Sequence, residues 1–275
     1  MATATAPPVP LDDPLARACR LNYVEFDREL GRWSGADGAV EERDGVVLWA
    51  TASEFPVSLN GVVRVDPATP ADRVMSLADE WFARLGRGHT VNVVEGVDDD
   101  LRAAAEAAGL VVMRDSPQMV RDRPCEPAPT PEGVVLRWAD SIDDIVRFAD
   151  VVDRSYQSLG APAGAIAGSV VAHHRVLEPH VETVLAEVDG EVAACAQLLL
   201  SHGIGGVYYV GTLEEARGRG LGELVTRAVT DQAFERGATA VGLQASPMGE
   251  PIYRRLGFRE LYRQAGLVRL APAPP

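Results

Sequence analysis

A glycine-rich segment in the second half of the chain carries residues suited to binding an anion. β-Forming residues at 207–210 are followed by glycines at 218, 220 and 222, and then by apolar residues at helical spacing over 223–229. A strand that passes through glycines into a helix start lets main-chain N–H groups surround a phosphate, and the helix dipole favours negative charge there. Arg217 and Arg219 add positive side-chain charge. The segment therefore predicts a phosphate cradle over residues 217–222.

The spacing of the glycines narrows the kind of cradle. A P-loop ends in Gly-Lys-Ser/Thr, and the chain contains no lysine. A Rossmann turn has its last two glycines three residues apart, whereas Gly218, Gly220 and Gly222 alternate. A glycine-rich turn that serves only the fold is the alternative, because short motifs recur by chance.

Tyr253 lies in a second segment with chemical potential. Residues 251–256 are typical of a short helix, with Pro251 at its first position and Gly257 just beyond its end. A phenol has a reference pKa of ~10 and can act as a general acid at neutral pH. The alternative is a tyrosine that packs its ring and leaves its hydroxyl in solvent.

Together the two segments resemble the GCN5-related N-acetyltransferase (GNAT) superfamily. Residues 217–222 meet its acyl-CoA signature Gln/Arg-x-x-Gly-x-Gly/Ala, and residues 253–258 meet its later pattern Tyr-x-x-x-Gly-Phe. The resemblance covers residues 133–270 by the order of the motifs and residues 11–122 only through an internal repeat.

The resemblance implies direct transfer of an acetyl or other acyl group from acetyl-CoA to a primary amine, without a metal. It implies that Tyr253 protonates the departing CoA thiolate. Main-chain groups of Val210 and Thr212 would hold the pantetheine, and the N–H of Leu213 would polarise the thioester carbonyl. The residues implied for the pyrophosphate are Arg217, Gly218, Arg219, Gly220, Leu221 and Gly222. Ser246 stands near the position where the family often has a cofactor-contacting asparagine.

The base that takes the proton of the amine stays open. The candidates are Glu214, Glu215, His202, His173 and His174, and each is more readily explained as a surface or loop residue. The acceptor also stays open, as a small-molecule amine or an amine of a protein. A non-catalytic acyl-CoA-binding or interaction module is the alternative function.

Composition limits the other classes of function. The chain of 275 residues is 47% hydrophobic and 24% charged, which is typical of a globular protein. A formal net charge of −14 argues against nucleic acid as a partner. Three widely spaced cysteines form neither a metal pair nor a disulfide framework, and there is no signal peptide or membrane-length apolar run. We therefore expect a cytoplasmic protein, and its oligomeric state stays open.

The chain has two similar halves. The turn pairs Asp44-Gly45 and Asp189-Gly190 are offset by 145 residues (189 − 44), and Gly109 and Gly257 by 148 (257 − 109). Each half has the order hairpin, strand, helix, strand, short helix, strand. We predict a mixed α/β (α+β) fold of two GNAT-like domains, each a mixed, mostly antiparallel sheet flanked by helices. In the second half we also expect a helix over about residues 163–176.

A Pro-rich stretch sets the expected boundary between the halves. The predicted parts are a disordered tail at 1–10, a first domain at 11–122, a linker at 123–132 and a catalytic domain at 133–275. In the first half the segment 66–70 lacks glycine and contains two prolines, which remove main-chain donors. Ala105 stands four residues before Gly109, where Tyr253 precedes Gly257. We therefore predict a degenerate first half.

Overall fold

The two Asp-Gly pairs form tight hairpin turns. Asp44 and Gly45 have φ values of 52° and 71°, and Asp189 and Gly190 have 54° and 84°. Positive φ at both central residues is the geometry of a type I′ turn, whose twist matches that of the flanking strands. The turns join β1 (Ala39–Arg43) to β2 (Val46–Ala50) and β7 (Val181–Val188) to β8 (Glu191–Ser201).

The computed structural model describes residues 12–270, so the tail predicted at 1–10 lies outside the described residues. The remaining elements of the first half are α1 (Pro14–Trp33), β3 (Asn60–Arg64), α2 (Ala71–Leu85), β4 (His89–Val94), α3 (Asp99–Ala107) and β5 (Val111–Arg121). Those of the second half are β6 (Val134–Trp138), α4 (Ile142–Gln157), β9 (Ile204–Thr212), α5 (Leu221–Glu235), β10 (Ala240–Gln244), α6 (Glu250–Arg255) and β11 (Arg259–Arg269). This mixed α/β architecture agrees with the predicted fold class.

The helix expected over residues 163–176 is wrong. Two short 3₁₀ turns, at Ala167–Ser169 and His173–Leu177, occupy that segment. The carboxylate of Asp153 accepts hydrogen bonds from the N–H groups of Gly164, Ile166 and Ala167 at 2.8–3.2 Å. Because one side chain satisfies these donors, the segment folds as a loop around Asp153.

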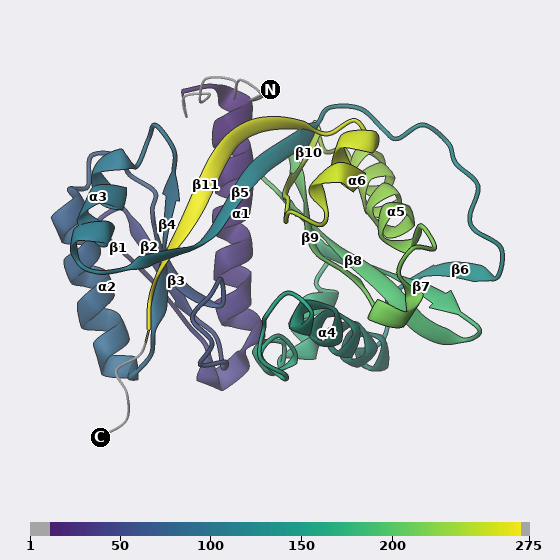
Figure 1. The fold of residues 1–275 in the computed structure, drawn as a ribbon, viewed down its shortest axis with the longest axis horizontal. Coiled ribbons are helices and arrows are strands. Elements are labelled where there is room, and N and C mark those ends of the chain that lie inside the picture. Colours follow the sequence, from purple (N-terminus) through teal and green to yellow (C-terminus); the bar gives the residue numbers. More distant parts are fainter. Residues whose placement is uncertain (1–11, 271–275) are drawn as a thin grey trace.

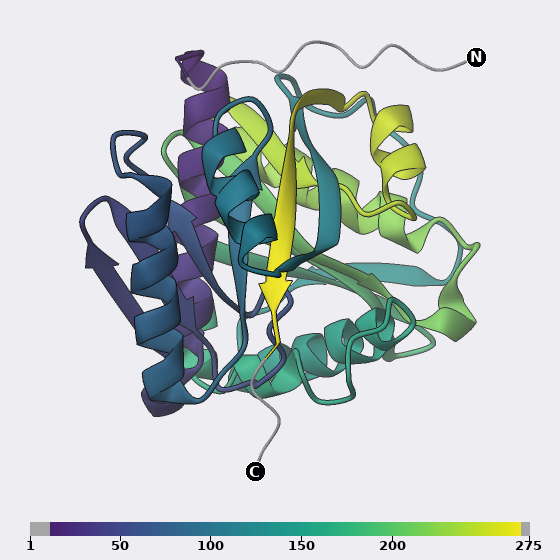
Figure 2. The same cartoon turned by 60° about the vertical axis from the view of Figure 1, so that its left-hand side comes forward.

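The strands form one continuous eleven-stranded sheet in the order β1-β2-β3-β4-β11-β5-β10-β9-β8-β7-β6 (Figures 1 and 2). The last strand of each half is exchanged with the other half. β11 lies between β4 and β5 of the first half, and β5 lies between β10 and β11 of the second. The sequence repeat did not predict this exchange, because equivalent strands have equivalent patterns wherever they pair. The limits of the two domains stay a prediction.

The two exchanged strands are related by a local two-fold arrangement. The offset of 148 residues that relates Gly109 to Gly257 also maps Val111–Arg121 onto Arg259–Arg269. β5 and β11 pair antiparallel, with Ser116 opposite its own repeat equivalent Gln264. The register shifts lie symmetrically on the two sides of this pair. In Figure 1 the two strands arch together from one half to the other.

Helix α1 joins the two halves on one face of the sheet. It packs against β1 and β2 of the first half and against β8 and β9 of the second, and it runs between the halves in Figure 1. α2 and α3 cover the opposite face of the first half, where they build a separate core. In the second half α4 and α5 pack on β8 and β9. The main core contains residues of α1, β2 and the second half together, so the halves share their interior.

Candidate acyl-transfer site

The strands β9 and β10 separate at the predicted cradle. They pair in parallel only from Ala240 opposite Ile204 to Gly242 opposite Gly206. β9 then continues to Thr212 without β10 beside it, so one edge of the strand is open. A register shift against β8 lies in this stretch, where Tyr209 has a φ of 49°. Such a bulge bends the strand and commonly lies next to a functional site.

The turn that follows β9 leaves main-chain donors free. Gly218 and Gly220 have φ values of 77° and 79°, and nothing lies within 4 Å of a Cβ built at either position. Within the described chain, no main-chain N–H of residues 218–223 donates to a protein acceptor, and the first one that does is Leu224, to the Gly220 carbonyl. These donors face the start of α5, where the helix dipole favours an anion. The turn has the structure expected of a phosphate cradle.

Arg217 contacts the protein more than the sequence suggested. Its Nη2 donates to the Ser158 hydroxyl at 2.6 Å and to the Ser155 carbonyl at 3.3 Å, and its Nε donates to the Thr212 carbonyl. The guanidinium therefore ties the turn to the end of α4 and the end of β9. It lines the site, but part of its hydrogen-bonding capacity serves the protein.

Tyr253 lies on α6 and is 8% exposed. Its ring packs edge-on against Phe258, with centroids 6.1 Å apart. A Cβ built on Gly249 meets the Tyr253 ring at 2.7 Å, so only glycine leaves room for it. Burial raises the pKa of Tyr253 to about 12. The phenol is therefore protonated at neutral and mildly alkaline pH, as a general acid must be.

One cavity of about 510 Å³ connects the open edge of β9, the cradle and Tyr253. Of the residues predicted from the sequence, those that line it are Val210, Thr212, Arg217, Gly218, Gly220, Leu221, Gly222, Ser246 and Tyr253. The structure therefore brings two segments that are separate in the sequence to one site.

Two predicted residues do not reach the cavity. Arg219 is exposed and is not part of the lining. The N–H of Leu213 donates to the Ala193 carbonyl at 2.9 Å, and its side chain is buried. This N–H completes the pairing of β9 with β8 and is not available to a thioester carbonyl. Because donors alternate along a strand, the N–H of Thr212 faces the open edge instead.

Sequence reasoning missed the wall of the cavity on α4. Ser155, Tyr156 and Leu159 line it, and Ser155 is 4% exposed with no hydrogen-bond partner for its hydroxyl among the described residues. Burial raises the pKa of Tyr156, and the nearby Tyr253 adds to this rise. The helical pattern of α4 marks its apolar face but gives no sign that its last turn meets the cradle.

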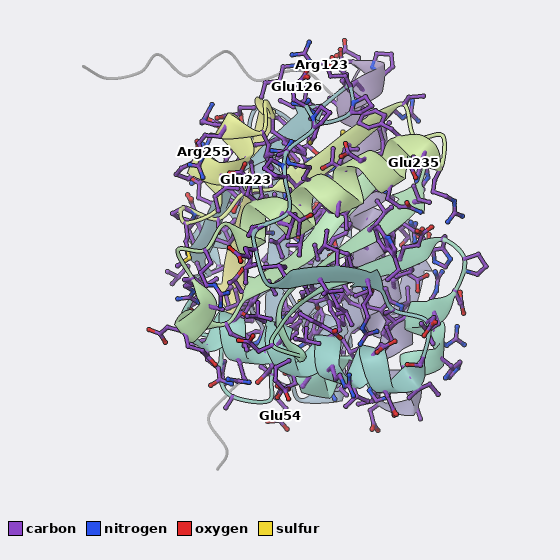
Figure 3. All side chains as sticks on the ribbon, turned by 90° about the vertical axis from the view of Figure 1, so that its right-hand side faces the viewer. Glu54, Arg123, Glu126, Glu223, Glu235 and Arg255 are labelled. Atoms are coloured by element: carbon purple, nitrogen blue, oxygen red, sulfur yellow. The ribbon has the colours of Figure 1, made fainter. Side chains whose placement is uncertain are left out.

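A charged pair also borders the cavity. Arg255 and Glu223 both line it, and their charged groups are 3.5 Å apart. Figure 3 shows them side by side on α6 and α5. The Arg255 side chain is 61% exposed, so it is free to turn toward an anion in the site.

None of the five candidate bases lines the cavity. Glu215 pairs with Arg154 on the surface at 2.8 Å, and Glu214 is exposed beside it. His202 lies in the turn between β8 and β9, and His173 and His174 lie in a 3₁₀ turn. The arrangement therefore gives these residues no part in the site.

Residues 12–270 lack two further features. No group of three or more His, Cys, Asp or Glu side chains there is arranged to hold a metal ion. No helix in this range has both the length and the apolar character needed to cross a bilayer. All three cysteines are buried and free.

The fold and the site define a class. A mixed sheet whose strands separate beside a glycine-rich helix start, with a buried tyrosine across the cavity, is the GNAT architecture. Residues 147–258 match the family model of the acetyltransferase (GNAT) family. This matched segment, which contains both the cradle and Tyr253, is therefore assigned to the GNAT family.

Solved structures resemble the whole chain. A GCN5-related N-acetyltransferase from Kribbella flavida is 23% identical with a TM-score of 0.68, covering 94% of this chain and 96% of that one. One from Sphaerobacter thermophilus is 19% identical with a TM-score of 0.59, covering 98% and 95%. A tandem GNAT protein from the clavulanic acid biosynthesis pathway is 15% identical with a TM-score of 0.58, covering 100% and 92%. These likenesses show the fold. Comparison with curated proteins finds no match.

Proposed function

We propose that the protein is an N-acetyltransferase that uses acetyl-CoA as its acyl donor and a primary amine as its acceptor. Family membership and fold support acyl transfer as the type of function. The observation that carries the finer proposal is the single cavity that joins free main-chain donors to a buried tyrosine. This pairing supplies an anion site for the donor and an acid for its leaving group.

Different residues bind the acyl donor and transfer the proton in such a reaction. Main-chain N–H groups of 218–223 hold the pyrophosphate, and the open edge of β9 at Val210 and Thr212 pairs with the pantetheine amides. The amine attacks the thioester carbonyl, the C–S bond breaks, and Tyr253 gives its proton to the sulfur. The proton that the amine loses restores the tyrosine through solvent. No covalent enzyme intermediate is needed.

The experiment is an assay of free thiol with acetyl-CoA and a broad panel of amines. Thiol release that depends on an amine, together with a rise in the unfolding temperature on adding acetyl-CoA, supports the proposal. Stabilisation by acetyl-CoA without turnover of any amine favours an acyl-CoA-binding module instead. If acetyl-CoA neither stabilises the protein nor is consumed, the proposal is wrong.

A further inference from the structure

Two arginines line the acyl-transfer cavity, and different contacts hold them. In the described chain, Arg217 and Arg255 are the positively charged side chains of its lining. Arg217 donates to two main-chain carbonyls and to the Ser158 hydroxyl, so its guanidinium is fixed between α4 and β9. Arg255 on α6 is held more loosely, and it is the cation of this cavity that is left for a ligand.

The contacts of Arg255 are weak. Its Nη2 lies 3.5 Å from the Glu223 carboxylate, and its Nη1 donates to the Pro251 carbonyl of the same helix at 3.2 Å. An exposed ion pair at such a separation contributes little to stability, because water screens both charges. The guanidinium can therefore leave Glu223 at little cost.

Glu223 keeps a partner when Arg255 turns away. The other oxygen of its carboxylate lies 3.2 Å from Nη2 of Arg227, one turn further along α5. Arg227 is the more buried of the two arginines, with 17% of its side chain exposed. In Figure 3, Glu223 and Arg255 lie next to each other on the surface. Movement of Arg255 therefore leaves Glu223 paired with Arg227.

The pair of Arg255 and Glu223 lies at the rim of the cradle. Glu223 is the third residue of α5, and its N–H is one of the free donors of 218–223 in the described structure. Arg255 reaches the Glu223 carboxylate from α6. Its guanidinium therefore lies beside the helix start that is proposed to hold the pyrophosphate.

The proposed acyl donor carries a further phosphate group. Acetyl-CoA has a phosphate monoester on the 3′ oxygen of its ribose, separate from the pyrophosphate. Such a monoester has a charge of about −1.5 to −2 at neutral pH and three acceptor oxygens. Arginine suits this group, since two of its N–H groups donate in parallel to two phosphate oxygens. With the cradle donors on the pyrophosphate, the monoester needs a donor of its own.

We propose that Arg255 leaves Glu223 and binds the 3′-phosphate of acyl-CoA, so that the protein distinguishes CoA esters from their 3′-dephospho forms. This role rests on the proposed use of acetyl-CoA, and it names a residue that selects the donor. The exchange moves the guanidinium from a carboxylate with one negative charge to a phosphate with nearly two. The stronger Coulomb attraction favours the bound position.

The test compares the binding of acetyl-CoA and of 3′-dephospho-acetyl-CoA to wild type and to Arg255→Gln. Isothermal titration at low salt measures the four affinities. We expect wild type to bind acetyl-CoA about three- to tenfold more tightly than the dephospho form, as for one partly exposed charged contact. We expect Arg255→Gln to bind the two forms within about twofold of each other and to keep the wild-type affinity for the dephospho form. Added salt should lower the preference of wild type.

Arg254→Gln is the matched control. Arg254 is the neighbouring residue of α6 and its side chain is 50% exposed, but it pairs with Glu250 and Glu260 and does not line the cavity. Both substitutions remove one positive charge, so an effect of net charge alone appears in both variants. We expect Arg254→Gln to keep the full preference for acetyl-CoA. Both variants should unfold within about 2 °C of wild type, because each loses only exposed ion pairs.

Three outcomes overturn the inference. One is that Arg255→Gln keeps the wild-type preference, or that Arg254→Gln loses as much of it. Another is that Arg255→Gln weakens both donors equally, which means that Arg255 contacts a different part of the donor. The third is that wild type binds both forms equally. A wild-type protein that binds neither form overturns the proposed function as well, whereas one that binds acetyl-CoA without acetylating any amine contradicts the proposed function alone.

Discussion

The turn between β3 and α2 and the turn between β9 and α5 occupy equivalent places in the two halves and differ in what their donors do. After β9, the N–H groups of 218–223 are free in the described structure. After β3, the Asp66 side chain accepts from Ala68 at 2.9 Å, the Asp66 carbonyl accepts from Thr69, and the other two positions are proline. One turn offers its donors to a ligand, while the other uses them on itself.

The strands that lead into these turns also differ, because β9 has an open edge and β3 does not. β3 and β4 also pair over three positions, but β3 ends at Arg64, directly after the last pair. Where the strands separate, Arg64 pairs with Asp98 at 2.9 Å, and both side chains are at most 3% exposed. Arg20 of α1 completes the group at 3.0 Å from Asp98. A buried ion cluster thus fills the place where the second half has an open strand edge.

The comparison shows what the first half contributes to the second. The first half uses the main-chain donors of residues 66–70 on contacts of its own, but it gives β5 to the second half. Gln118 of β5 accepts from the Gln244 side chain at 2.6 Å, and Arg121 donates to the Leu256 carbonyl at the end of α6. Since α6 carries Tyr253, the first half supports the element that holds the proposed acid.

The largest expected effect is that of Tyr253→Phe, which removes the hydroxyl and keeps the ring. We expect kcat to fall by about 10²–10⁴-fold, as for the loss of a general acid, with little change in acetyl-CoA affinity. Steady-state thiol release and a binding titration measure the two quantities. An unchanged kcat contradicts the role given to Tyr253.

The next effect tests the ion cluster of the first half. Asp98→Asn leaves Arg20 and Arg64 buried without their shared carboxylate, so we expect a loss of about 3–5 kcal/mol in the free energy of unfolding. Urea titration measures it. We expect no second acetyl-CoA site to open, because the turn at 66–70 still lacks free donors. A loss below ~1 kcal/mol would show that the cluster does not hold the first half together.

Alanine substitutions at two similar glycines distinguish the cost of backbone strain from an effect on ligand binding. Gly220 and Gly237 have φ values of 79° and 85°, and a Cβ at either meets nothing within 4 Å. Alanine at each should therefore cost a similar ~1–2 kcal/mol of stability. Only Gly220→Ala should weaken acetyl-CoA binding, because its Cβ enters the cradle. Equal affinities for acetyl-CoA in the two variants contradict the cradle.

The smallest effect concerns the exposed edge of the ion cluster. The hydrogen bond from Arg64 lowers the pKa of Asp100, whose side chain is 58% exposed. A lowered pKa stabilises the fold above the usual pKa of an aspartate, near ~3.9, and the contribution is lost as the pH falls. Asp100→Asn should cost about 0.2–1 kcal/mol at neutral pH and less in acid. Urea titrations at neutral pH and in acid measure this cost in the free energy of unfolding. A cost that is larger in acid than at neutral pH contradicts the pairing of Asp100 with Arg64.

Local patterns predicted much of this structure. The Asp-Gly hairpins follow from interactions within a few residues, and the structure has them. The cradle and Tyr253 were found because glycine spacing and a tyrosine near a helix-ending glycine are short signals. In the structure both segments line one cavity, and their catalytic roles stay a prediction.

The rest depends on contacts between distant segments. The exchange of β5 and β11 leaves no local trace, since each strand has the same pattern in either position. The hydrogen bond from the Leu213 N–H to the Ala193 carbonyl depends on the register of β8 and β9. Asp27 is a polar residue in an amphipathic helix, and nothing in its sequence neighbourhood reveals that its carboxylate is buried without a partner.

The central claim is that one half of the duplicated chain binds the acyl donor and the other does not. Isothermal titration of the full chain with acetyl-CoA tests it directly. We predict one molecule bound per chain, with affinity weakened by Gly220→Ala and unchanged by Gly237→Ala. Two molecules per chain, or binding that Gly220→Ala leaves intact, would contradict the claim.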